Sequence, residues 1–146
     1  MRSLRPIILA VLALAAVAVP RAASAAVELG LGADYLFEPQ AGTFPLTLAV
    51  DTPLARHLTI GGRFGVLLLT DPSRVGIPLD FRLRARFSKL YVDGLVGPWI
   101  LFSDSDPIRF HAGFGFGVVM RHIELGLEVG YLNPTGMLGL RLAFPF

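Results

Sequence analysis

Hydrophobic and polar residues alternate with a period of two along most of the chain after residue 26. Such alternation is typical of β-strands with one apolar and one polar face, and clusters of Pro, Gly, Asn, Asp and Ser mark the turns between them. The pattern predicts eight strands, over residues 27–37, 43–51, 57–69, 77–87, 90–102, 108–120, 123–132 and 137–146. It also predicts a turn at 52–56 and loops at 38–42, 70–76, 103–107 and 133–136.

Charged residues define the polar faces of these strands. The fourth strand alternates most clearly, with apolar residues on one face and Asp80, Arg82, Arg84 and Arg86 on the other. The fifth strand is the least regular, and there the position of Asp93 indicates the outward residues: Leu90, Val92, Val96 and Ile100. No apolar face of any predicted strand carries a charge, and glycines occupy many of the remaining polar-face positions.

The polar faces carry equal numbers of acidic and basic residues. The seven acids are Glu28, Asp34, Asp51, Asp80, Asp93, Glu124 and Glu128, and the seven bases are Arg63, Arg82, Arg84, Arg86, Arg109, Arg121 and Arg141. We therefore expect a barrel with its apolar faces outward and a ladder of paired charges inside, with His111 also in the interior. Glycine on the inner face leaves room for large side chains of neighbouring strands.

The N-terminus has the features of a cleaved secretory signal peptide. Arg2 and Arg5 precede a short apolar run, and the small residues before Ala25 suit a signal peptidase. We predict a signal peptide at 1–25 and a barrel domain at 26–146; a transmembrane helical anchor is the alternative, but the apolar run is short for one. Loss of Arg2, Arg5 and Arg21 reduces the 13 basic residues to 10, against 11 acidic ones. The mature charge gives no reason to expect nucleic-acid binding.

The last predicted strand alternates up to a terminal aromatic residue, Phe146. In this the chain resembles the small eight-stranded bacterial outer-membrane β-barrels, the group that includes the outer membrane protein A-like transmembrane domains. The resemblance implies an all-β, eight-stranded antiparallel up-and-down transmembrane barrel in a Gram-negative envelope. It implies that Phe146 is the signal read by the barrel-assembly machinery. The expected partners are outer-membrane lipid and, during biogenesis, this machinery and periplasmic chaperones, with the barrel a monomer.

Aromatic residues fit two girdles at the membrane surfaces. If the N-terminus is periplasmic, the outer girdle contains Tyr35, Phe44, Phe110 and Tyr131, and the periplasmic girdle contains Phe87, Phe144 and Phe146. A soluble barrel or sandwich would instead use such residues in its core. The short loops argue mildly against an adhesin or a receptor, because recognition of large ligands usually needs longer loops.

Candidate chemistry is sparse. The serines after residue 26 are predicted in loops or turns, and none lies within a few residues of His57, His111 or His122, so we expect no catalytic residues and no cofactor. Asp104 and Asp106 in one loop could hold a cation loosely, but a solvated loop without a metal is the favoured interpretation.

The resulting functional hypothesis is a structural, non-catalytic outer-membrane barrel whose interior is filled by paired charges. An eight-stranded barrel encloses a space just wide enough for side chains. Two alternatives remain open. The barrel could be a narrow pore for small solutes, with the arginines at 82, 84 and 86 lining an anion path. It could also be a soluble periplasmic barrel that binds an apolar ligand.

Overall fold

The structure, a computed structural model, describes residues 25–38 and 40–146. The predicted signal peptide and its cleavage near Ala25 lie almost entirely outside the described residues and stay predictions. The strands are β1 (Ala26–Leu36), β2 (Ala41–Ala55), β3 (Leu58–Thr70), β4 (Ser73–Phe87), β5 (Leu90–Leu101), β6 (Ile108–Met120), β7 (Ile123–Leu132) and β8 (Thr135–Pro145). The described residues contain no helix with the length and hydropathy needed to cross a bilayer.

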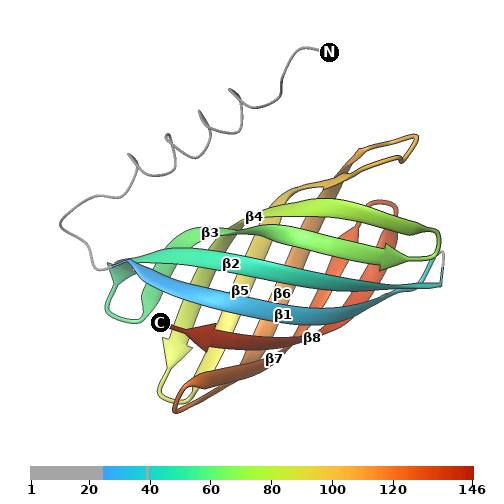
Figure 1. Ribbon diagram of the computed structural model, residues 1–146. Coiled ribbons are helices and arrows are strands. Elements are labelled where there is room, and N and C mark those ends of the chain that lie inside the picture. The colour runs from blue at the N-terminus through green and yellow to red at the C-terminus, as the bar shows by residue number, and fades with distance from the viewer. Residues whose placement is uncertain (1–24, 39) are drawn as a thin grey trace.

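The eight strands form a closed antiparallel barrel in which each strand pairs with its neighbours in the sequence (Figure 1). β1 closes the barrel by pairing with β8, so that Leu29 lies opposite Phe144 and Tyr35 lies opposite Leu138. Closure removes the two free edges that an open sheet of these strands would have. The predicted all-β, eight-stranded, up-and-down architecture is confirmed.

The connections between strands gather at the two ends of the barrel. Residues 56–57, 88–89 and 121–122 form three two-residue turns at one end, together with the start of β1 and the end of β8 (Figure 1). We call this the turn end. The connections at 37–40, 71–72, 102–107 and 133–134 lie at the opposite end, which we call the loop end. This division positions every feature described below.

Four predicted strand boundaries are wrong by two residues or more. β2 begins at Ala41 rather than at residue 43, and β8 begins at Thr135 rather than at residue 137. Residues 52–55 of the predicted turn at 52–56 are strand, because β2 continues to Ala55 and pairs with β3, with Pro53 opposite Thr59. β1 pairs with β2 only as far as Asp51, so at Pro53 the strand has a neighbour on one side only and a missing N–H costs little. β4 begins at Ser73 rather than at residue 77, which shortens the connection from β3 to two residues.

Three further prolines lie inside the strands of the closed barrel. Pro45, Pro78 and Pro98 each lie where pairing with one neighbouring strand is interrupted, in the β1–β2, β3–β4 and β4–β5 ladders respectively. Proline has no N–H to donate to a ladder. The interruptions therefore accommodate it without leaving a broken hydrogen bond in an otherwise continuous sheet.

Side chains alternate between the outside and the inside of the barrel, as the sequence predicts. In β4, Leu83 is 40% exposed, whereas Arg82 and Arg84 on either side of it are 3% and 2% exposed. In β5, buried Asp93 and exposed Val96 confirm the predicted phase of that strand. The aromatic residues expected at the two rims are mostly exposed: Tyr35, Phe44, Phe110 and Tyr131 at the loop end, and Phe87 and Phe146 at the turn end.

Candidate functional site

The barrel interior is the candidate functional site, because it collects almost all the polar chemistry of the strands. It is divided along the axis into two parts. A charged section extends from the turn end to beyond the middle of the barrel, and an apolar section fills the loop end. Because side chains alternate along each strand, every second one points into this space. The position of a residue along its strand decides whether it joins the charged or the apolar section.

At the turn end, Arg82 and Arg84 of β4 share the carboxylate of Glu28 from β1. The Arg82 Nη1 donates to Glu28 Oε1 at 2.8 Å, and the Arg84 Nη1 donates to Glu28 Oε2 at 2.7 Å. Arg82 also donates to both carboxylate oxygens of Asp51. Glu28 therefore screens two guanidinium groups that stand on the same face of one strand, two residues apart.

Arg84 makes the most ion pairs of the residues in this section. Its Nε and Nη2 donate to the two oxygens of Asp93 at 2.6 and 2.8 Å, in the bidentate geometry that arginine and carboxylate favour. Its Nη1 also donates to Glu124 at 2.6 Å, and Arg86 pairs with the other oxygen of Glu124. The guanidinium carbon lies 4.3 Å from the centre of the Tyr91 ring, an additional cation–π contact.

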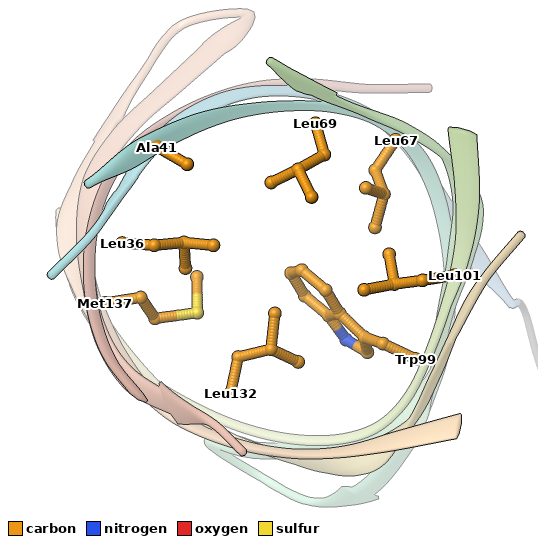
Figure 2. Close-up of a cluster of buried hydrophobic side chains, with 8 residues drawn as sticks. All are labelled: Leu36, Ala41, Leu67, Leu69, Trp99, Leu101, Leu132 and Met137. Carbon is orange, nitrogen blue, oxygen red and sulfur yellow. The ribbon is translucent and has the colours of Figure 1, made fainter. Parts of the chain in front are cut away.

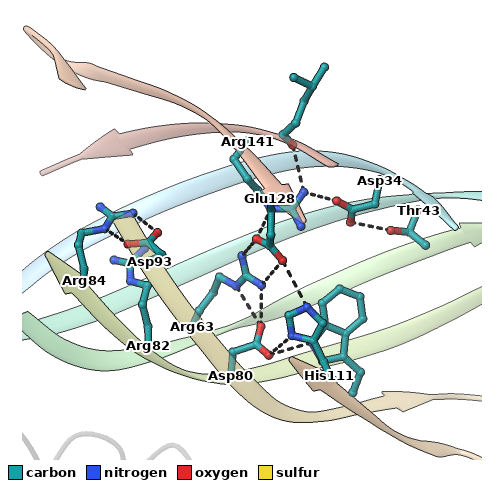
Figure 3. A network of polar contacts seen from close by, with 12 residues as sticks. Asp34, Thr43, Arg63, Asp80, Arg82, Arg84, Asp93, His111, Glu128 and Arg141 are labelled. Atoms are coloured by element: carbon teal, nitrogen blue, oxygen red, sulfur yellow. Dashed lines mark hydrogen bonds and ion pairs between the residues drawn. The ribbon is translucent and has the colours of Figure 1, made fainter. Parts of the chain in front are cut away.

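In the middle of the barrel, Arg63 of β3 bridges two strands (Figure 3). Its guanidinium donates to Asp80 at 2.7 and 3.1 Å and to Glu128 at 2.7 and 3.2 Å. Arg141 of β8 donates to Glu128 at 2.9 Å and pairs with Asp34, which accepts a hydrogen bond from Thr43 at 2.8 Å. These contacts form a second network, which joins strands from all sides of the interior and shares no hydrogen bond with the turn-end group in the described residues.

His111 lies where the charged section meets the apolar section. Its Nδ1 is 2.6 Å from Asp80 Oδ1, and its Nε2 is 3.3 Å from Glu128 Oε1. The indole N–H of Trp99 donates to the same Asp80 oxygen at 3.1 Å, and the two ring centres are 4.5 Å apart. Both rings are fully buried. His111 is consequently held in a fixed position by two carboxylates and by an indole ring tilted at 32° to its own.

The apolar section, which we call the apolar plug, consists of eight buried side chains at the loop end: Leu36, Ala41, Leu67, Leu69, Trp99, Leu101, Leu132 and Met137. Figure 2 shows them pointing from all around the wall into the barrel interior. The plug was not predicted from the alternation of apolar and polar residues. A signal for it exists, because the runs at 66–69 and 99–101 are apolar at consecutive positions and so supply apolar residues to both faces.

The interior leaves little space for solvent. One cavity of about 30 Å³ lies among the charged side chains, lined by Glu28, Arg63, Arg82 and Arg84 with their neighbours. That volume suits one or two water molecules. Gly126 illustrates how tightly the wall fits, because a Cβ at that position would lie 2.1 Å from the Tyr91 hydroxyl oxygen.

The structure places ten of the eleven predicted ladder residues in two interior networks. The network at the turn end contains Arg82, Arg84, Asp93 and Glu124, with Arg86 at its margin. The network in the middle of the barrel contains Arg63, Asp80, His111, Glu128 and Arg141. The eleventh ladder residue, Arg109, lies elsewhere, and so does Arg121, which is also one of the seven bases predicted on the polar faces. Arg109 is at the loop end and pairs with Asp104, and Arg121 is exposed in a turn. The interior therefore holds seven carboxylates and five guanidinium groups rather than seven of each.

Asp104 lies in the 102–107 connection between two arginines. Its carboxylate accepts from Arg109 Nη2 at 2.6 Å and lies 2.8 Å from Arg74 Nη1. Burial alone would raise the pKa of Asp104, but the hydrogen bond from Arg109 and the charges of both arginines lower it below its ordinary value. This carboxylate is occupied by arginines and is not arranged as a cation site with Asp106. Among the described residues, no group of three His, Cys, Asp or Glu side chains has metal-site geometry.

The interior contains a histidine–aspartate pair but no nucleophile beside it. His111 contacts Asp80, Glu128 and Trp99, and Ser105 bonds weakly to the loop residue Asp104. In the part of the chain that the structure describes, no serine hydroxyl forms a hydrogen bond with a histidine ring.

Comparisons with known proteins give a match in structure only. No protein-family model matches the chain, and no curated protein is significantly similar to it in sequence. A de novo designed transmembrane β-barrel aligns over 83% of this chain and 95% of its own, with a TM-score of 0.64 and 13% identity. The chain has the fold of the small transmembrane β-barrels.

Two natural outer-membrane proteins share this fold. The outer membrane enzyme PagL aligns over 82% of this chain and 98% of its own, with a TM-score of 0.58 and 10% identity. The outer membrane protein Ail of Yersinia pestis aligns over 85% of this chain and 99% of its own, with a TM-score of 0.52 and 13% identity. An enzyme and a designed protein both have this architecture, so the fold does not decide the activity.

Proposed function

We propose that the mature chain is a structural, non-catalytic barrel of the bacterial outer membrane, with an interior closed to solutes. The main support is the inversion of a soluble core: large apolar side chains cover the outside, and the charged residues of the strands share the inner face. In water such a surface would be costly, whereas in a bilayer it is the favoured arrangement. The same observation speaks against the soluble carrier, whose apolar residues would line an inner cavity.

The height of the apolar surface supports this placement. In β4 the outward residues from Val75 to Phe87 are apolar throughout. At about 3.3 Å per residue and a tilt of about 40°, they cover roughly 30 Å along the barrel axis. That is close to the hydrocarbon thickness of a bilayer, about 30 Å.

Gel mobility with and without boiling tests the barrel and its location together. The protein in an outer-membrane fraction should migrate differently before and after boiling, because the closed barrel resists detergent until it is heated. Recovery in the soluble fraction with a single mobility would contradict the proposal. Folding the purified chain into lipid vesicles repeats the test without the cell.

A closed interior predicts the absence of conductance. Among the described residues, the apolar plug and the paired charges fill the interior around a cavity of about 30 Å³. In planar bilayers the purified barrel should therefore show no discrete current steps in ordinary salt. Reproducible steps, lost when the protein is heat-denatured, would favour the narrow-pore alternative instead.

The non-catalytic part of the proposal rests on the missing nucleophile beside His111. Because the outer membrane enzyme PagL has the same fold, the absence of catalysis needs a test of its own. Purified folded protein should release no fatty acid from phospholipid or from lipopolysaccharide, as judged by chromatography of the lipid products. Release that persists in wild type and is lost in His111→Gln would overturn the proposal.

We also propose that Phe146 serves as the assembly signal. Its backbone N–H donates to the carbonyl of Val27 at 2.9 Å, while its side chain is 82% exposed at the turn end. Recognition by assembly machinery, rather than packing, would then explain the aromatic side chain. Phe146→Ser should lower the amount of barrel in the outer membrane of cells but leave folding into vesicles unchanged; equal loss in both would contradict this role.

A further inference from the structure

The two ends of the barrel differ in the charge of their exposed residues. Each two-residue turn at the turn end carries one permanent cation: Arg56, Lys89 and Arg121. The turns contain no acidic residue, and none of these three cations has an ion-pair partner in the described part of the chain. We call this set the cationic turns.

The loop end has the opposite balance. Its exposed and half-buried charged residues are the acids Glu38, Asp71, Asp104 and Asp106 and the bases Arg74 and Arg109, and both of these arginines are engaged by Asp104. The uncompensated positive charge of the barrel surface is therefore confined to the turn end. If these cations served only to attract soluble anions, they would not need to be gathered at one end of the barrel.

The cationic turns are held side by side by the backbone. The carbonyl of His57, in the first turn, accepts a hydrogen bond from Arg86 N at 2.8 Å, and the carbonyl of Lys89, in the second, accepts from Val119 N at 2.7 Å. The His57 ring also stacks on Phe87, with ring centres 6.5 Å apart. These contacts join each turn to the next hairpin, so the cations stand on one rigid rim.

Each cation lies within a few residues of the apolar outer surface. Leu54 is 58% exposed, Phe87 is 57% exposed and Met120 is 50% exposed, one or two residues before Arg56, Lys89 and Arg121 respectively. At about 3.3 Å per residue, the cations stand just beyond the edge of the hydrocarbon. That is the depth of lipid phosphates, which arginine and lysine bind by charge and hydrogen bonding.

We infer that the cationic turns bind the phosphates of anionic phospholipids in the leaflet that surrounds the turn end. The inference rests on the proposed placement of the barrel in a membrane and adds the class of lipid and the residues that select it. Three unpaired cations give an electrostatic preference of several-fold at low ionic strength, and salt weakens it because the groups are exposed.

Electron paramagnetic resonance of spin-labelled lipids tests the inference in the folded, full barrel. In phosphatidylcholine vesicles, spin-labelled phosphatidylglycerol should associate with the wild type roughly three- to tenfold more strongly than spin-labelled phosphatidylcholine. Lys89→Gln/Arg121→Gln should remove most of this preference. The matched control Arg74→Gln/Arg109→Gln removes the same net charge at the loop end and should retain it, and 0.5 M salt should weaken the wild-type preference.

Each result has one meaning. Equal loss in both double variants would assign the effect to net charge and overturn the inference, as would a preference that survives in Lys89→Gln/Arg121→Gln. A barrel that inserts, shows its heat-dependent mobility and lacks any preference refutes this inference alone. A protein that does not insert in vesicles refutes the proposed function, and the inference falls with it.

Discussion

The surplus of carboxylates over guanidinium groups inside the barrel predicts that losing an arginine destabilises more than losing an acid. The pair formed by Arg84 and Asp93 is the best place to test this, because both side chains are buried, at 2% and 6% exposure. Asp93 has no hydrogen-bond partner other than Arg84 in the described structure, whereas Arg84 also bonds to Glu28 and Glu124.

The two substitutions therefore leave different groups without partners. Arg84→Met leaves the Asp93 carboxylate buried and unpaired, which should cost about 3–5 kcal/mol of the free energy of unfolding. Asp93→Asn leaves Arg84 two carboxylates at 2.6 and 2.7 Å, and should cost about 1–2 kcal/mol. The double variant Arg84→Met/Asp93→Leu should be more stable than Arg84→Met alone, because no unpaired carboxylate remains at position 93.

Urea unfolding of the barrel in lipid vesicles measures these differences. Trp99 is the only tryptophan of the sequence and lies inside the barrel, so its emission reports opening of the interior. The Trp99 emission of each variant before urea is added, and its heat-dependent gel mobility, serve as controls for correct assembly. If Asp93→Asn proves as destabilising as Arg84→Met, or if the double variant is the least stable of the three, the argument from surplus carboxylate is wrong.

Three other perturbations probe the remaining features. Leu83→Arg places a charge on the outward face and should lower the free energy of unfolding in vesicles by about 2–4 kcal/mol, whereas an unchanged value would contradict the assigned facing. Leu132→Ala cuts into the apolar plug and should cost about 2–5 kcal/mol in the same urea assay; a cost below about 1 kcal/mol would mean that the plug is loosely packed. Because the pKa of Asp104 is lowered, its ties to Arg74 and Arg109 should hold at pH 5 and be lost only as the pH falls below the ordinary carboxyl value of about 3.9. Protease cleavage within 102–107 should increase in that acidic range in wild type and at all pH values in Asp104→Asn, and an increase already at pH 6 would contradict this.

The sequence predicted the fold because strand alternation is a local property. A period of two fixes which residues share a face, and the absence of charge on the apolar faces fixed which face is outside. Even the irregular β5 was oriented correctly from Asp93 alone, since one buried charge sets the phase of a whole strand. The strand boundaries were less predictable. Proline is typical of turns, and Pro53 fits within β2 only because β1 does not pair with β2 at that position.

The interior was only partly predictable, because it depends on height along the barrel as well as on facing. Arg109 has the parity of an inward residue of β6, and Arg121 directly follows that strand. Both lie at the ends of β6, where side chains reach solvent or loop partners. The plug residues Leu67 and Leu101 share the inward parity of the charges and differ from them only in height. The consecutive apolar runs at 66–69 and 99–101 hint at this difference within single strands, but the register between neighbouring strands is needed to show that the runs lie at the same height.

The division of the interior into a charged section and the apolar plug has a consequence for how the barrel stays shut. The two sections are barriers in series with opposite sensitivities: protonation and salt weaken the one made of ion pairs, while neither acts on the one made of Leu67, Trp99 and their apolar neighbours. A condition that loosens one barrier leaves the other in place. Conversion of this barrel into a pore would therefore require changes at both heights, and no single substitution should suffice.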